Sequence, residues 1–117
     1  MKFMFMIYHD ENELRALPER EMQTLVDSAL DYDDEIRRSG HYIVSDALQP
    51  AHTARTIRVR GGKVSTTDGP FGETKEQLGG FILIEARDLN DAIQVAAKIP
   101  MGRRGTIEVR PIKELKR

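Results

Sequence analysis

The stretch Lys2-Phe3-Met4-Phe5-Met6-Ile7-Tyr8 bears most directly on the fold, because it is apolar at almost every position. A strand with one face in water alternates apolar and polar residues, whereas a strand covered on both faces is a continuous apolar run. This stretch therefore predicts a buried strand inside a sheet. Phe81–Glu85 has the same character and predicts a second buried strand.

Two amphipathic helices are expected between the strands. Residues 18–39 repeat apolar side chains at the spacing of one helical face: Met22, Leu25, Val26, Ala29, Leu30 and Ile36. Gly40 follows at the position where a left-handed residue commonly ends a helix. Asp88 predicts the N-cap of a second helix that ends near Pro100.

Shorter strands and turns complete the pattern. Further strands are predicted at residues 42–48, 54–60, 63–67 and 106–111. Gly61-Gly62 is a hairpin signal, and the glycine-rich, charged stretch Asp68–Gly80 predicts a loop. The order of elements predicts an α+β fold, a ferredoxin-like βαββαβ sandwich with an inserted β-hairpin.

The predicted sheet has one face without a cover. Two helices cover only one face, and the sequence contains no third helix for the other. A bare apolar sheet face would exceed the few hundred Å² that monomers usually expose. The sequence therefore predicts a homodimer packed sheet to sheet. The alternative is that the hairpin folds over this face.

Composition limits the function classes. The 117 residues form one domain. The absence of cysteine excludes disulfides, thiolate metal sites and cysteine nucleophiles. A net charge of −1 argues against a dedicated nucleic-acid binder. No apolar run is long enough to span a membrane, and no signal peptide is recognisable, so a cytoplasmic location is expected.

The densest polar segment is the predicted loop Asp68–Gly80. In a functional interpretation, Asp68 or Glu73 accepts a proton and Lys75 holds an anion, beside an apolar cavity that contains Phe71. In a structural interpretation, the same segment is a turn: Asp68 caps it, Phe71 fills the core and the charged residues form weak surface ion pairs.

Other candidate residues lie outside this loop. His9 ends the first predicted strand beside Asp10, where an imidazole and a carboxylate can pair; the alternative is an exposed loop histidine. Tyr8, Tyr32, Gln49 and Arg58 are candidates for contact with a ligand in a cleft between the first helix and the sheet. The histidine spacings fit no local metal-ligand pattern, and no dinucleotide motif is present, so no metal or cofactor is expected.

The loop sequence Asp-Gly-Pro-Phe-Gly-Glu-Thr-Lys-Glu-Gln-Leu-Gly-Gly closely resembles the signature of the YCII-related family, in its DGPF branch. Ala47–Pro50 and Gly105–Pro111 resemble further segments of that family, and the resemblance covers essentially the whole chain. Gly72 stands where alanine is more usual.

The resemblance implies a dimeric α+β barrel of ferredoxin-like halves, but no settled activity. Some relatives carry a His–Asp pair proposed as an active site, and one is a dehydrochlorinase of a chlorinated hydroxyquinone. The histidine position falls near Ala29, so only Asp68 corresponds to a member of that pair. Relatives are often encoded beside extracytoplasmic-function sigma factors.

Two functions follow as hypotheses. The first is a cofactor-independent enzyme for proton transfer or elimination on a small carbonyl or phenolic compound, with Asp68 as the base and Lys75 or Arg58 holding the anionic oxygen. The alternative is a non-catalytic ligand-binding or regulatory module linked to a sigma factor of that class.

Overall fold

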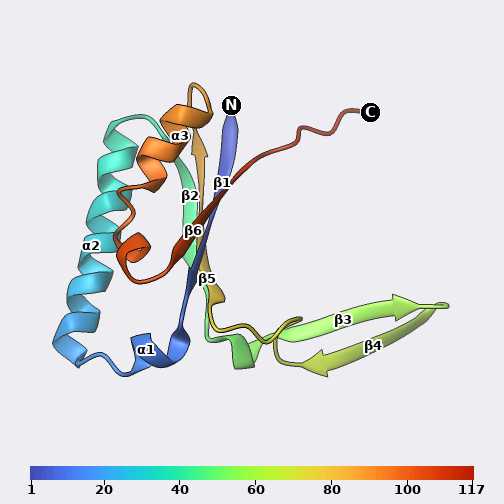
Figure 1. Cartoon of the computed structure of the whole chain (residues 1–117). Helices are drawn as coiled ribbons and strands as arrows, with labels where there is room; N and C mark the ends of the chain where they lie inside the picture. Colours follow the sequence, from blue (N-terminus) through green and yellow to red (C-terminus); the bar gives the residue numbers. More distant parts are fainter.

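The computed structural model describes all residues from 1 to 117 and has two layers, helices on one side and a sheet on the other (Figure 1). The elements are β1 (Lys2–His9), α1 (Glu11–Arg15), α2 (Glu19–Arg38), β2 (Tyr42–Ala47), η1 (Ala51–Thr53), β3 (Arg55–Arg60), β4 (Lys63–Asp68), β5 (Gln77–Glu85), α3 (Leu89–Ala96), η2 (Pro100–Arg103) and β6 (Thr106–Pro111). The four-stranded sheet has the order β2-β5-β1-β6 with antiparallel neighbours, and β3 and β4 form a separate hairpin. This is the predicted ferredoxin-like α+β fold.

The core lies between the sheet and the helices. Phe3 and Phe5 of β1 are fully buried, and their cross-strand partners Ile84 and Ile82 on β5 are buried with them. β1 lies between β5 and β6 in the sheet, with one of its faces buried and the other only half-buried.

Helix α2 packs on this core only through its C-terminal half. Tyr32 and Ile36 are its buried residues, and the Tyr32 hydroxyl donates a hydrogen bond of 2.6 Å to the Val95 carbonyl of α3. Val26 and Leu30, on the same apolar stripe, remain 42% and 57% exposed. The apolar stripe of α2 is therefore only partly covered as far as Leu30.

The helix ends follow local signals that the sequence carries. Gly40 ends α2 at φ +83°, and the Asp88 carboxylate accepts a hydrogen bond from the Asp91 N–H to cap α3. The short helix α1 was not predicted. Asp10 begins it by accepting hydrogen bonds from the N–H groups of Asn12 and Glu13.

The β3–β4 hairpin projects away from the rest of the molecule, on the side of the sheet that the helices do not cover (Figure 1). The predicted alternative, in which the hairpin folds over the open sheet face, is therefore not observed. The chain measures 49 × 47 × 18 Å with a radius of gyration of 16.3 Å, against about 13 Å for a compact chain near this length.

The open sheet face carries apolar side chains. Met4 and Met6 of β1 lie opposite Leu83 and Phe81 of β5, and all four are only partly buried.

No helix of the molecule is long and apolar enough to cross a membrane.

Candidate functional site

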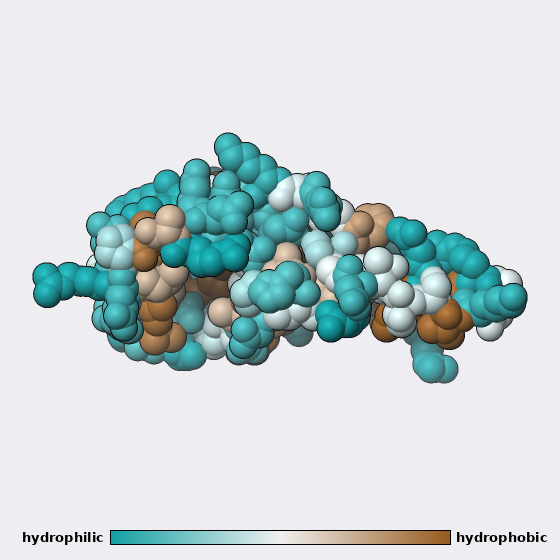
Figure 2. Space-filling model, turned by 90° about the horizontal axis from the view of Figure 1, so that it is seen from below, coloured by the Kyte–Doolittle hydropathy of each residue, from teal (hydrophilic) through white to brown (hydrophobic).

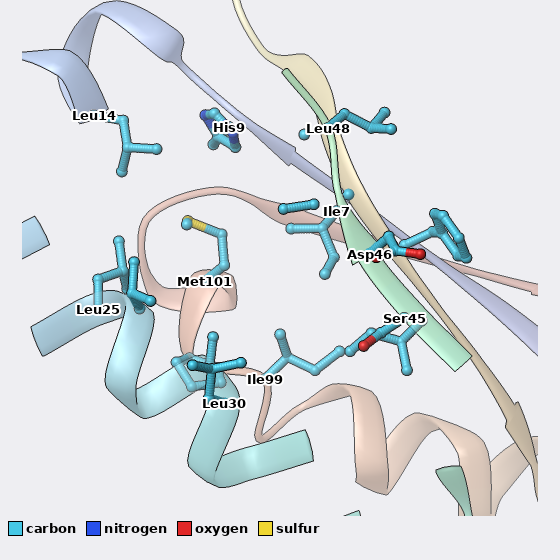
Figure 3. Close-up of a pocket in the computed structure, with 18 of the residues that line it drawn as sticks. Ile7, His9, Leu14, Leu25, Leu30, Ser45, Asp46, Leu48, Ile99 and Met101 are labelled. Atoms are coloured by element: carbon cyan, nitrogen blue, oxygen red, sulfur yellow. The ribbon is translucent and has the colours of Figure 1, made fainter. Parts of the chain in front are cut away.

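A cavity of about 640 Å³ lies between α2, over residues 22–33, and the sheet. In the space-filling view, apolar residues surround a hollow on the helix side of the molecule, away from the projecting hairpin (Figure 2). Most of its lining is apolar and comes from α1, α2, the sheet and η2, including Ile7, Leu14, Met22, Leu25, Leu30 and Met101 (Figure 3). The cavity therefore lies along the partly covered stripe of α2.

Two glycines of β5 shape the wall of this cavity. A Cβ at Gly79 would overlap the His9 imidazole, and a Cβ at Gly80 would come within 2.9 Å of the Asp46 carbonyl oxygen. Glycine in a strand commonly marks such a close approach. Gly79 thus provides the space in which the His9 ring lies.

Two histidines line the cavity: His52, which is exposed, and His9, which is half-buried. Figure 3 shows it at one end of the cavity, near Leu14 and Leu48. Its Nδ1 is shielded from solvent and has no hydrogen-bond partner. Asp10 does not supply one, because its carboxylate caps α1. An enclosed polar atom without a partner costs free energy, so this ring nitrogen calls for an explanation.

A second polar group lies at another part of the lining. The Ser45 hydroxyl donates a hydrogen bond of 3.0 Å to the Asp33 carboxylate, and the Tyr42 hydroxyl lies 2.9 Å from Ser45 Oγ. Because the serine proton is directed at Asp33, the tyrosine is the donor to Ser45. Asp33 and Ser45 both line the cavity and link α2 to β2.

Asp33 and Ser45 were not among the predicted site residues. One signal in the sequence was available for Asp33, which follows Ala29 by one helical turn and interrupts the apolar stripe of α2. Ser45 had none, because its proximity to Asp33 depends on how β2 returns along the helix. Ala29 itself lines the cavity.

Two predicted site residues, His9 and Tyr32, line this cavity. The Tyr32 hydroxyl is engaged by the Val95 carbonyl, and burial raises the pKa of Tyr32 to about 12, with a smaller contribution from the charge of Glu35. Tyr32 is therefore a neutral structural donor here.

Tyr8 lies on the opposite face of the sheet. Its hydroxyl donates to the Glu108 carboxylate at 3.1 Å, and Arg110 donates to the same carboxylate at 2.8 Å. Desolvation first, and then the hydrogen bond and charge of Glu108, raise the pKa of Tyr8. This polar group flanks the open sheet face and does not reach the cavity.

The structure does not bring the Asp68 loop to the cavity. The Asp68 side chain is 88% exposed at the end of β4 and forms an ion pair of 3.1 Å with Arg55. Phe71 is 81% exposed, so it neither fills the core nor lines the cavity. The Arg58 guanidinium lies over its ring, 5.3 Å from the ring centroid.

The remaining candidates are also at the surface. Gln49, Glu73 and Lys75 are exposed and do not line the cavity. The loop is held by its own hydrogen bonds, among them two from the Gln77 side-chain amide to the carbonyls of Gly72 and Thr74.

Comparisons with known proteins find matches to both the sequence and the fold of this chain. The model of the YCII-related domain matches residues 1–116. The chain belongs to the YCII-related family. An uncharacterised protein of Rhizobium meliloti is 31% identical over 114 residues, which cover 96% of this chain and 92% of that protein.

A solved structure shares the fold of this YCII-related chain. It is the 5-chloro-2-hydroxyhydroquinone dehydrochlorinase of Burkholderia phenoliruptrix in complex with 2,5-dihydroxybenzoquinone. The TM-score is 0.57 at 14% sequence identity, over 97% of this chain and 94% of that one. At this identity, the similarity shows the fold alone.

Proposed function

We propose that the cavity beside α2 binds a small, mainly apolar carbonyl or phenolic compound and that His9 accepts a proton from it, in a proton transfer or elimination without a cofactor. The observation that carries this proposal is the His9 imidazole in the wall of an apolar cavity. Its Nδ1 is shielded, so Nε2 is the nitrogen left to meet a ligand. A neutral imidazole is suited to take up a proton near neutral pH.

The dimensions and lining support a ligand of this class. A volume of about 640 Å³ falls in the usual range for small-molecule sites, which are mainly apolar with a few placed polar groups. The dehydrochlorinase with a similar fold was solved in complex with 2,5-dihydroxybenzoquinone. In this chain, the Asp33 carboxylate lines the cavity and can accept a hydrogen bond from a hydroxyl of such a ring.

In an elimination, His9 would remove a proton from the substrate. The electron pair of the broken bond forms a new double bond, and the leaving group departs as an anion. The imidazolium then releases its proton to water, so that the net change is loss of HX. Asp68 has no role in this proposal, because its carboxylate is paired with Arg55 on the exposed hairpin.

The test separates binding from turnover. We expect Leu25→Trp, which fills the cavity, to weaken binding of 2,5-dihydroxybenzoquinone at least about tenfold, measured by calorimetry. His9→Gln should keep binding within a few fold but lower chloride release from 5-chloro-2-hydroxyhydroquinone by about 100-fold or more. Circular dichroism controls for folding.

Asp68→Asn discriminates the two candidate bases. The proposal expects this variant to match the wild type in both assays. Loss of turnover in Asp68→Asn with retention in His9→Gln would assign the base to Asp68 and overturn the role of His9. Unchanged binding in Leu25→Trp would remove the cavity from the proposal.

A second candidate is supported by Ala29. This residue lines the cavity at the position where the family resemblance implies a histidine, so one expected acid–base group is absent. A binding or regulatory module would bind the same compounds without turnover. Its link to an extracytoplasmic-function sigma factor rests on the genomic setting of relatives and is tested by co-elution of the two proteins.

We also propose that the chain acts in the cytoplasm as a homodimer joined through the open sheet face. The half-buried apolar pairs Met4–Leu83 and Met6–Phe81 support this contact. Sedimentation of the wild type against Met6→Lys tests it, with a monomeric wild type at micromolar concentration as the contradicting result.

A further inference from the structure

We propose that the β3–β4 hairpin is an arm that clasps a second copy of this chain, and that the Asp68–Gln77 loop braces this arm instead of serving the ligand cavity. The arm is defined as β3, β4 and the Gly61-Gly62 turn. The inference rests on the homodimer proposed above.

The arm has no cover within its own chain. Every residue of its two strands is exposed except Thr56, which is half-buried. A two-stranded hairpin alone in water is marginally stable at best, and it needs further strands or a packed face. A hairpin that keeps this shape therefore requires a partner surface.

One face of the arm is apolar and the other is basic. Val59 lies opposite Val64, and Ile57 is on the same face; they are 55%, 68% and 63% exposed. The other face pairs Arg58 with Ser65 and Arg60 with Lys63. The apolar face is the one that gains free energy from being covered.

The Asp68 loop contacts the basic face through Phe71, whose side chain stays exposed. Arg58 on that face lies over the ring of Phe71. At the base of the arm, the Gly69 N–H donates to the Ala54 carbonyl at 2.8 Å, and the Thr56 hydroxyl donates to the Gly69 carbonyl at 3.0 Å. Gly69 adopts φ +97°, which favours glycine. The loop thus fixes the arm while leaving its apolar face free.

The size of the contact favours a second copy as the occupant. Four strands about 4.8 Å apart and about six residues long give a sheet face of roughly 400 Å². A stable interface buries about 800 Å² on each partner, twice that area.

The arm supplies the missing area. One of its faces measures roughly 200 Å², and in a two-fold dimer each copy both gives an arm and receives one. Because the arm projects on the uncovered side of the sheet (Figure 1), a copy docked on that sheet lies beside the arm. Sheet and arms together reach the area of a stable dimer.

The test compares two neighbouring residues on opposite faces of the arm. Val64→Lys places a charge on the apolar face and should raise the dimer dissociation constant at least about tenfold in analytical ultracentrifugation. Ser65→Lys, on the other face, should leave it unchanged. Equal effects of the two variants, or none from Val64→Lys, would overturn the proposal.

A spectroscopic readout avoids dependence on charge. Because the chain contains no cysteine, a single Val64→Cys or Ser65→Cys variant carries a spin label at one known place. The label at position 64 should be immobilised at dimeric concentrations and mobile on dilution, whereas the label at 65 stays mobile. A label at 64 that is mobile in the dimer would overturn the arm contact.

The same data separate this inference from the homodimer itself. A monomeric wild type would remove both. A wild-type dimer that Met6→Lys dissociates and Val64→Lys does not would leave the sheet contact standing and remove the arm. Ligand binding in the cavity is measured independently of either result.

Discussion

At the scale of single residues, Gly79 and His9 depend on each other. The imidazole lies where a side chain at position 79 would be. The wall of the cavity therefore requires a glycine on one strand as much as a histidine on the next.

We predict that Gly79→Ala displaces the His9 ring. The overlap should cost about 1–3 kcal/mol in the free energy of unfolding, measured by urea denaturation, and should weaken ligand binding as well. Gly72→Ala is the matched control, because a Cβ there meets nothing within 4 Å. Equal stability of the two variants would contradict the prediction.

The residue scale also shows why part of the site was predictable. His9 was a candidate because it ends a buried strand, and it does line the cavity, while its role stays a prediction. Phe71 was placed wrongly beside the cavity or in the core, because an apolar side chain indicates a need for cover but not which surface provides it. Asp33 and Ser45 meet only after α2 and β2 are placed in space.

At the scale of elements, two polar contacts join α2 and its C-terminal turn to α3. One is the Tyr32 hydroxyl on the Val95 carbonyl. The other is His41, whose Nε2 lies 3.1 Å from the Asp91 carboxylate while its Nδ1 contacts the Ser39 hydroxyl at 2.7 Å. Ser39 donates to the Ile36 carbonyl, so this group holds helix ends together.

Because of the first contact, from Tyr32 to Val95, the stability of the fold should fall as the pH rises above about 10. Tyr32 has a pKa of about 12 in the folded chain and about 10 when unfolded. Between these values the unfolded chain releases a proton that the folded chain keeps, so stability falls as pH rises. Tyr32→Phe should remove this part of the slope and cost about 1 kcal/mol at neutral pH. Urea unfolding from pH 8 to 11 measures the stability and its slope with pH. The same slope in Tyr32→Phe as in the wild type would contradict this role of Tyr32.

The second contact, between His41 and Asp91, affects the stability of the fold at low pH. The Arg87 backbone N–H, then the His41 side chain, lower the pKa of the Asp91 carboxyl. The stabilisation is complete above the unfolded pKa, near 4, and is lost as pH falls through the folded value. Asp91→Asn should flatten the loss of stability between pH 5 and 2 in chemical denaturation. Asp27→Asn, on the exposed face of α2, should keep the wild-type curve.

At the scale of the whole molecule, the order of elements was predictable because each has a local pattern. The run at residues 2–8, the stripe ending at Gly40 and the Gly61-Gly62 turn specify their elements through neighbouring residues. No local pattern specifies the direction in which the hairpin leaves the sheet. None specifies that α2 packs on the core only near its C-terminal end. These two features determine where the cavity and the Asp68 loop lie. They explain why the predicted site residues are divided between the cavity and the hairpin.

The projecting hairpin also affects the newly made chain. Both β3 and β4 have an unpaired edge, and such edges attract other strands, while exposed tips are preferred sites of cleavage. In the proposed dimer, these edges and the tip stay exposed until a second copy binds. Synthesis of many copies in one place would shorten that vulnerable interval, since encounter is faster when copies are crowded.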